Sequence, residues 1–195
     1  MTCDLQNSFP LYDFHQIFVV LCLLEASERD ALLAHRAILK GDNDVLIELV
    51  CTRSPRQLCL AKDAYQALYK KSVKEDIAQA RARICHELLL PLTSPYHYSG
   101  LKVDEHEAQK DAPMLHEKTS EKDYSNRDVR WFLATRSKAR LKATLDHYRC
   151  AYGNDIYKDL EADPTNQFLH IQRNTIECLT CPEKYFRKVL HVAIM

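Results

Sequence analysis

Glycine is scarce in this 195-residue chain, which contains only three glycines and seven prolines. This composition argues against a turn-dense all-β protein, because tight turns between strands depend on glycine and proline. Neither Gly-x-Gly nor the Gly-x-x-x-x-Gly-Lys loop that holds nucleotide phosphates occurs in the sequence. Long segments rich in alanine, leucine, lysine, glutamate and arginine instead predict an all-α fold.

An excess of charge is also missing, since 27 basic side chains balance 27 acidic ones. We therefore expect no nucleic-acid partner, and any attraction to an anionic membrane must come from a local patch. The apolar run at residues 17–24 is too short to span a bilayer, which takes about 20 residues. No lysine or arginine precedes Arg29, so the basic start of a secretory signal is lacking.

The eight cysteines are scattered and mostly lie in apolar helical segments. This pattern predicts reduced, buried thiols in an intracellular, cytoplasmic protein. Cys178-x-x-Cys181 has no second pair at zinc-ligand spacing, and the nine histidines form no His-Glu-x-x-His motif. Because no nucleophile–base pair and no cofactor loop is found either, the sequence predicts a protein that is not an enzyme.

What the chain does have is an internal repeat, because one set of residues recurs 83 positions further along. A shared register over such a span indicates a duplicated unit. Within each copy the leucines and tyrosines fall at helical spacing, and a serine precedes the helix where an N-cap belongs. The first copy contains Thr52, Arg53, Ser54, Leu58, Tyr65, Tyr69 and Asp76, and the second contains Thr135, Arg136, Ser137, Leu141, Tyr148, Tyr152 and Asp159.

Apolar spacing and capping residues predict five helices in each unit, alternating long and short. Ser27 and Asp30 form a loose capping box for the first of them. The last predicted helix, 183–194, matches the opening helix of the first unit, so another repeat begins there. The expected helices cover 27–40, 44–51, 54–71, 72–78 and 81–90, then 104–120, 126–134, 137–152, 155–162 and 163–179.

Four stretches carry a resemblance to a known family: 27–31 (Ser-Glu-Arg-Asp-Ala), 45–54 (Val-Leu-Ile-Glu-Leu-Val-Cys-Thr-Arg-Ser), 136–144 (Arg-Ser-Lys-Ala-Arg-Leu-Lys-Ala-Thr) and 178–186 (Cys-Leu-Thr-Cys-Pro-Glu-Lys-Tyr-Phe). With the repeat, they resemble the annexins, particularly plant annexins. The resemblance implies all-α repeats of five helices in a right-handed superhelix. It divides the chain into a remnant of repeat one (1–24), repeat two (25–96), a linker (97–103), repeat three (104–180) and the first helix of repeat four (181–195).

The resemblance implies a peripheral membrane protein that binds anionic phospholipid through Ca²⁺ held in loops on one convex face. Such a loop combines Gly-x-Gly-Thr carbonyls with a carboxylate from a later loop. The loop at 40–44 has one glycine, the loop at 120–125 has none, and the distal position of repeat two falls near Ala80. In repeat three that position falls on Asp163, which we predict as a weak Ca²⁺ ligand or else as the cap of a helix beginning at Pro164.

Arg53 and Arg136 close short helices beside the tyrosine positions. We predict structural ion pairs of Arg53 with Asp76 and of Arg136 with Asp159, because a buried guanidinium needs its donors satisfied. Donation to carbonyl groups at helix ends is the alternative.

Two alternatives to calcium-dependent lipid binding stay open. One is a calcium-independent helical interaction module, with self-association through exposed repeat ends. The other is a redox-responsive thiol protein, since the resemblance implies that Cys51 and Cys178 lie close in space. Two packed core cysteines are the simpler interpretation of that pair.

Overall fold

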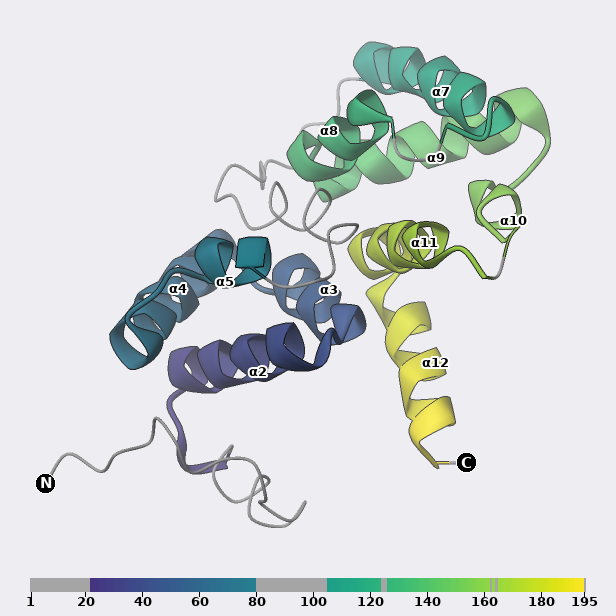
Figure 1. Cartoon of the computed structure of the whole chain (residues 1–195). Coiled ribbons are helices and arrows are strands. Elements are labelled where there is room, and N and C mark those ends of the chain that lie inside the picture. Colours follow the sequence, from purple (N-terminus) through teal and green to yellow (C-terminus); the bar gives the residue numbers. More distant parts are fainter. Residues whose placement is uncertain (1–21, 80–104, 124–125, 162, 164, 195) are drawn as a thin grey trace, which may run out of the picture.

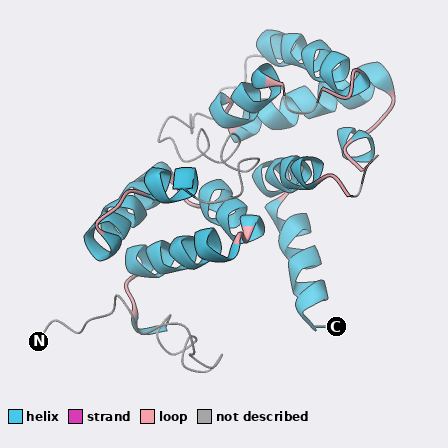
Figure 2. Ribbon diagram, in the orientation of Figure 1, coloured by secondary structure: helices cyan, strands magenta, loops and turns pink. Residues whose placement is uncertain are grey.

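The computed structural model describes residues 22–79, 105–123 and 126–194, apart from 162 and 164. Within these residues all regular structure is helical, joined by short loops (Figure 2), and the predicted all-α class is confirmed. The predicted helix at 81–90, the linker at 97–103 and most of the remnant at 1–24 lie outside the described residues.

The first unit contains four described helices, in which the opening helix contacts the other three. The pattern long, short, long, short predicted from the sequence is found again. Figure 1 shows this unit in purple and blue. Its helices are α2 (Ala26–Lys40), α3 (Asn43–Thr52), α4 (Pro55–Tyr69) and α5 (Val73–Gln79).

The second unit repeats this arrangement and adds a fifth helix, which lies beside α3 of the first unit. In both units the first and third helices pack closely against each other. A further helix then runs from the second unit to the end of the chain (Figure 1). These helices are α7 (Glu105–Ser120), α8 (Arg127–Thr135), α9 (Lys138–Tyr152), α10 (Ile156–Asp159), α11 (Gln167–Thr180) and α12 (Pro182–Ile194).

The predicted serine caps of the two third helices are confirmed. The Gln57 N–H donates to Ser54 Oγ at 3.3 Å, and the Arg140 N–H donates to Ser137 Oγ at 3.1 Å. Each bond satisfies an amide of the first turn that has no partner inside the helix, which stabilises a helix by about 1 kcal/mol. The two caps thus fix the start of α4 and α9.

The predicted capping box of the first helix is wrong. Helix α2 begins at Ala26, one residue before Ser27, and the Glu28 carboxylate accepts a hydrogen bond from the Glu25 N–H at 3.3 Å. Asp30 does not serve the helix start, because its side chain is buried and ion-paired elsewhere.

Two tyrosines at equivalent positions lie at the centre of the units. Tyr65 on α4 and Tyr148 on α9 are both fully buried and belong to the apolar core of the chain. A buried tyrosine contributes a large apolar ring but also a hydroxyl that needs a partner. The partners of these two hydroxyls determine the polar network described below.

Candidate functional site

The loop between α2 and α3 is a tight helix-ending turn around Gly41. This glycine has φ 70°, its N–H donates to Ile38 O at 3.3 Å, and the Asp42 N–H donates to Ala37 O at 2.8 Å. This is a Schellman motif, in which a residue with positive φ lets the last helical carbonyls find donors. The Asp42 carboxylate then accepts from the Val45 N–H at 3.3 Å and caps α3. The acid of this loop is therefore engaged within the loop itself.

The loop between α7 and α8 repeats the same turn without a glycine. Lys122 takes φ 56°, its N–H donates to Thr119 O at 3.1 Å, and the Asp123 N–H donates to Lys118 O at 3.0 Å. The Asp123 carboxylate accepts from the Asn126 side-chain amide at 2.8 Å. Lys122 thus occupies the left-handed position that Gly41 occupies in the first unit, and Asp123 matches Asp42.

Asp163 lies in the loop before α11 and bonds to its own turn. Its Oδ1 accepts from the N–H and the hydroxyl of Thr165, at 3.0 and 2.6 Å. These bonds hold the pKa of the exposed Asp163 carboxyl below its usual range. The predicted helix cap at this residue is wrong, because α11 begins at Gln167 and its N-cap is Asn166. Asn166 takes that role because its amide oxygen reaches the N–H groups of the first turn at 3.0 and 3.3 Å.

These loops do not assemble a complete cation site from side chains. Ca²⁺ takes six to eight oxygen ligands, commonly including carboxylates. Within the described ranges, no three histidine, cysteine, aspartate or glutamate side chains lie together in a way that would hold a metal ion. Asp163, the predicted Ca²⁺ ligand, is available only with the other carboxylate oxygen or by giving up its bonds to Thr165.

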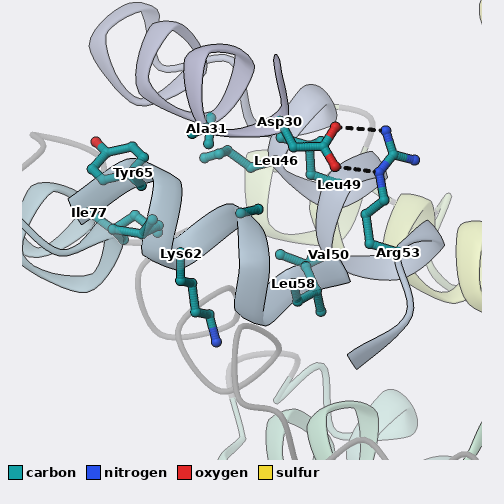
Figure 3. A pocket seen from close by; sticks show the side chains of 13 residues that line it. Asp30, Ala31, Leu46, Leu49, Val50, Arg53, Leu58, Lys62, Tyr65 and Ile77 are labelled. Atoms are coloured by element: carbon teal, nitrogen blue, oxygen red, sulfur yellow. Dashed lines mark hydrogen bonds and ion pairs between the residues drawn. The ribbon is translucent and has the colours of Figure 1, made fainter. Parts of the chain in front are cut away.

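The ion pair of Arg53 has a different partner from the one predicted. Its Nε donates to Asp30 Oδ2 at 2.6 Å and its Nη2 donates to Asp30 Oδ1 at 2.9 Å. Figure 3 shows this two-point contact at one side of a pocket lined by apolar residues such as Leu46 and Leu49. The apolar surroundings strengthen the pair, because water does not compete for the buried carboxylate. The pair joins the end of α3 to the first helix, α2.

Arg136 of the second unit likewise pairs with an acid on the first helix and not with Asp159. Its Nε and Nη2 donate to the two oxygens of Asp111 at 3.2 and 3.3 Å. Arg140 adds a third hydrogen bond to Asp111, from its Nε at 2.8 Å. The predicted pairings with Asp76 and Asp159 are therefore both wrong, while the structural role of the two arginines is retained.

Asp76 and Asp159 are instead the acceptors of the two buried tyrosines. The Tyr65 hydroxyl donates to Asp76 Oδ2 at 2.6 Å, and the Tyr148 hydroxyl donates to Asp159 Oδ2 at 2.7 Å. Burial, followed by the bond to the carboxylate, raises the pKa of each tyrosine above its ordinary value. A buried hydroxyl without an acceptor is costly, which explains why these carboxylates face the tyrosines.

Two histidines complete the polar chains, and the sequence analysis missed both. His35 Nδ1 lies 3.0 Å from the Tyr65 hydroxyl, and His116 Nδ1 lies 3.5 Å from the Tyr148 hydroxyl. Since each tyrosine gives its proton to an aspartate, the histidine must carry its own proton on Nδ1. The His35 ring stacks on Tyr69 at 3.8 Å between centroids, and the His116 ring stacks on the equivalent tyrosine at 3.7 Å.

The signal for these histidines is present in the sequence at another spacing. His35 and His116 lie 81 positions apart, as do Asp30 and Asp111, whereas the repeat found above has a spacing of 83. Between the first helix and the end of the second, the second unit contains two more residues than the first, so the first helices of the two units match at the shorter spacing. A search at both spacings would have found the four residues.

Cys51 of α3 and Cys178 of α11 lie in contact where the two units meet. Both are buried and free, and their side chains are hydrogen-bonded to each other. This bond, followed by burial, raises the pKa of Cys51, whereas the same bond lowers the pKa of Cys178. Lys138 Nζ donates to the Cys51 carbonyl at 2.6 Å, and its charge acts to lower the pKa of both thiols. The closeness that the resemblance implied is present in the structure.

None of the described helices is long and apolar enough to cross a bilayer. The described structure thus consists of two helical units. Each unit contains a chain of polar contacts from a histidine through a buried tyrosine to an aspartate. The loop acids bond within their own turns, and a pair of thiols lies between the units.

Comparison with known proteins identifies this arrangement. The Annexin family model matches residues 29–92. Annexin Gh1 of Gossypium hirsutum is 52% identical over 184 residues, covering 93% of this chain and 58% of that protein. Annexin D2 of Arabidopsis thaliana is 47% identical over 179 residues, covering 90% of this chain and 56% of that protein. The solved structure of annexin III has a TM-score of 0.80 and 27% identity, covering 95% of this chain and 58% of its own.

The chain thus spans a little over half the length of these relatives. With one family model, two plant relatives and a solved structure in agreement, the chain belongs to the annexin family.

Proposed function

We propose that this chain binds anionic phospholipid membranes peripherally, in the calcium-dependent manner of the annexin family. The observation that supports this most is the 52% identity to annexin Gh1 over nearly the whole chain. A calcium-bound annexin, (Sm)1, also shares the fold with a TM-score of 0.75. Peripheral attachment from the cytoplasm is consistent with the described helices, none of which is suited to span a bilayer.

The described loops support only weak Ca²⁺ binding in this proposal. Asp163 is the carboxylate in the position that the family uses, and the carbonyls near Lys122 and Asp123 are the expected backbone ligands. Each of the three acids discussed above already accepts a hydrogen bond inside its own turn. A cation must compete with those bonds, so we expect binding at millimolar rather than micromolar Ca²⁺.

The test compares two aspartate variants in co-sedimentation with phosphatidylserine vesicles over a Ca²⁺ titration. Asp163→Asn removes the proposed ligand, and Asp146→Asn makes the same change at an exposed position on α9. We expect Asp163→Asn to shift the Ca²⁺ midpoint upward by at least about fivefold, because Ca²⁺ prefers charged oxygen ligands. Equal midpoints for both variants and the unchanged chain would remove Asp163 from the site.

The thiol pair supports a second candidate function, a response to peroxide. In this reaction the Cys178 thiolate attacks one peroxide oxygen, the O–O bond breaks and a sulfenic acid forms. The Cys51 thiol then displaces water from that sulfur to give a disulfide, so one hydrogen peroxide and two thiols yield one disulfide and two waters. The observations favouring this function are the two buried, free thiols that shift each other's pKa and the Lys138 ammonium held 2.6 Å from the Cys51 carbonyl.

Mass spectrometry after peroxide treatment tests the thiol proposal. A loss of two hydrogens should appear in the peptide pair that contains Cys51 and Cys178, and Lys138→Met should slow its formation. Cys59, which is exposed on α4, serves as the comparison thiol. Oxidation of Cys59 alone would leave the buried pair as packed core cysteines.

A further inference from the structure

The turn between α4 and α5 carries a serine where the equivalent turn of the second unit carries an aspartate. Ser72 directly precedes α5, Asp155 directly precedes α10, and the two lie at the repeat spacing of 83. The Glu75 N–H donates to Ser72 Oγ at 3.2 Å, and the Tyr157 N–H donates to Asp155 Oδ1 at 3.2 Å. One position of the repeat thus holds a neutral hydroxyl in the first unit and a permanent negative charge in the second.

The charges around the two turns differ in the opposite sense. Residues 70–76 contain three lysines and two acids, a net charge of +1, whereas residues 153–159 contain one lysine and two aspartates, a net charge of −1. A phosphate on Ser72 would add a charge of about −2 and bring the first turn to about −1, the value that the second turn has permanently. The lysines Lys70, Lys71 and Lys74 therefore match a negative group that the unmodified serine lacks.

The side chains of this turn are accessible to a modifying enzyme. Ser72 is partly exposed, all three lysines are exposed, and 55% of the Lys71 side chain is open to solvent. In the part of the chain that the structure describes, Lys70 and Lys74 take part in no ion pair. The Ser72 N–H donates to the exposed Glu75 carboxylate at 2.7 Å, so Glu75 can turn into water without leaving a buried charge.

We propose that Ser72 is a phosphorylation site for a serine kinase that prefers basic substrates, and that Lys71 and Lys74 hold the phosphate. Lysines on both sides of a serine form the charge pattern by which such kinases select their substrates. The Ser72 oxygen attacks the γ-phosphorus of ATP, the bond from that phosphorus to the bridging oxygen of ADP breaks, and the hydroxyl proton passes to a base of the kinase. This inference uses neither the proposed Ca²⁺ ligands nor the thiol pair.

The phosphate would also act on the polar chain of the first unit, through Lys71. Lys71 Nζ now lies 3.8 Å from Asp76 Oδ1, and a phosphate carries more charge than a carboxylate and therefore competes for this lysine. In the second unit Asn154 stands at the position of Lys71, and Asp159 still accepts its tyrosine hydroxyl at 2.7 Å. We therefore expect the phosphorylated turn to take on the charge arrangement of the second unit without loss of the fold.

The first test incubates the full, folded chain with Mg²⁺, ATP and the catalytic domain of protein kinase C, and locates the phosphate by mass spectrometry. Ser120, an exposed serine followed by Glu121, is the control site. We expect phosphorylation of Ser72 at least about tenfold faster than of Ser120, and at least about fivefold slower after Lys71→Gln with Lys74→Gln, since the kinase reads those charges. The inference is overturned if Ser72 receives no phosphate, or if the two serines react at the same rate.

The second test asks whether the lysines hold the phosphate, by a phosphorus NMR titration of the phosphorylated chain. Because nearby cations favour the dianion, Lys71→Gln with Lys74→Gln should raise the second pKa of the phosphate by at least about 0.5. Lys40→Gln with Lys142→Gln makes the same change at two exposed lysines elsewhere and should leave that pKa unchanged. Equal values in the two double variants would overturn the assignment of Lys71 and Lys74.

Thermal melting tests whether the turn accepts the charge. Ser72→Asp introduces the residue type of the second unit and should melt within about 2 °C of the unchanged chain, because aspartate caps a helix as well as serine does. Ser72→Ala should melt about 2–4 °C lower, since it removes the bond to the Glu75 N–H. The inference is also overturned if Ser72→Asp melts as low as Ser72→Ala.

Discussion

Asp30 and Arg53 form a two-point ion pair across 23 residues, with contacts of 2.6 and 2.9 Å. The Asp30 side chain is 6% exposed and the Arg53 side chain 33%. The pair joins the first helix of the unit to the end of the second, and Asp111 and Arg136 make the same connection in the other unit. This connection holds each short helix against its long neighbour.

Breaking the Asp30–Arg53 pair should destabilise the protein markedly. Arg53→Met leaves a buried carboxylate without its cation. Such a change lowers the free energy of unfolding by about 3 kcal/mol or more, and we expect the lower value because Arg53 is partly exposed. Arg149→Met makes the same change in the exposed pair with Asp146 and should cost less than about 0.5 kcal/mol. Urea unfolding measures both, and equal costs would show that the buried pair has no special role.

Removing a buried tyrosine hydroxyl that bonds to a carboxylate should lower the free energy of unfolding more than removing one that bonds to a neutral group. Tyr65→Phe deprives the Asp76 carboxylate of a bond of 2.6 Å and should cost about 2 kcal/mol, as for bonds to charged groups. Tyr157→Phe removes a bond of 3.0 Å to the Thr180 hydroxyl and should cost about 1 kcal/mol. If the order of the two unfolding free energies were reversed, the polar chain would not stabilise the unit as described.

Stability should fall as the pH drops below about 6.5, the ordinary value for histidine, and His35 should account for part of the fall. Burial lowers the pKa of His35. The Asp76 carboxylate raises that pKa in part, and the Lys71 ammonium lowers it further. The unfolded chain therefore takes up a proton at higher pH than the folded chain. The lost stability accumulates from about pH 6.5 down to the lowered pKa and then stays constant.

Replacing the histidine isolates its share of this pH dependence. His35→Gln keeps a polar side chain but removes the titration, so the difference in unfolding free energy between the two proteins should shrink from pH 7.5 to pH 5. Chemical unfolding at several pH values measures that difference, and the exposed His191 is the control position. A difference that is constant with pH, or that grows toward acid, contradicts the account.

The two matched turns should respond in opposite directions to glycine exchange. Lys122→Gly relieves a non-glycine residue at φ 56° and should stabilise the protein by about 1 kcal/mol, whereas Gly41→Ala should destabilise it by a similar amount. No atom lies within 4 Å of a Cβ built on Gly41, so the cost there comes from the backbone alone. Thermal melting compares the pair, and equal signs would contradict the shared geometry.

The sequence was sufficient to predict the helical class and the starts of α4 and α9, because Ser54 and Ser137 act locally on adjacent amides. Side-chain pairing across helices was harder. The sequence analysis paired Arg53 with Asp76, but the buried Tyr65 takes that carboxylate and Arg53 pairs with Asp30 instead. That competition is decided by packing and leaves no local pattern.

Only part of the candidate site was predictable from the sequence. The absence of Gly-x-Gly could be read directly from the sequence, and so could the acid at Asp163. That its Oδ1 would bond to Thr165, and that Asn166 would cap α11, depended on loop geometry that the Asp-Pro pattern did not reveal.

The most direct test of the central claim is co-sedimentation of the full chain with phosphatidylserine vesicles, in millimolar Ca²⁺ and in EDTA. Vesicles of pure phosphatidylcholine serve as the uncharged comparison. We expect binding to the anionic vesicles in Ca²⁺ that is lost in EDTA, with little binding to the neutral vesicles in either buffer. A chain that stays in the supernatant under all of these conditions would contradict the account, because an annexin fold would then be present without membrane binding.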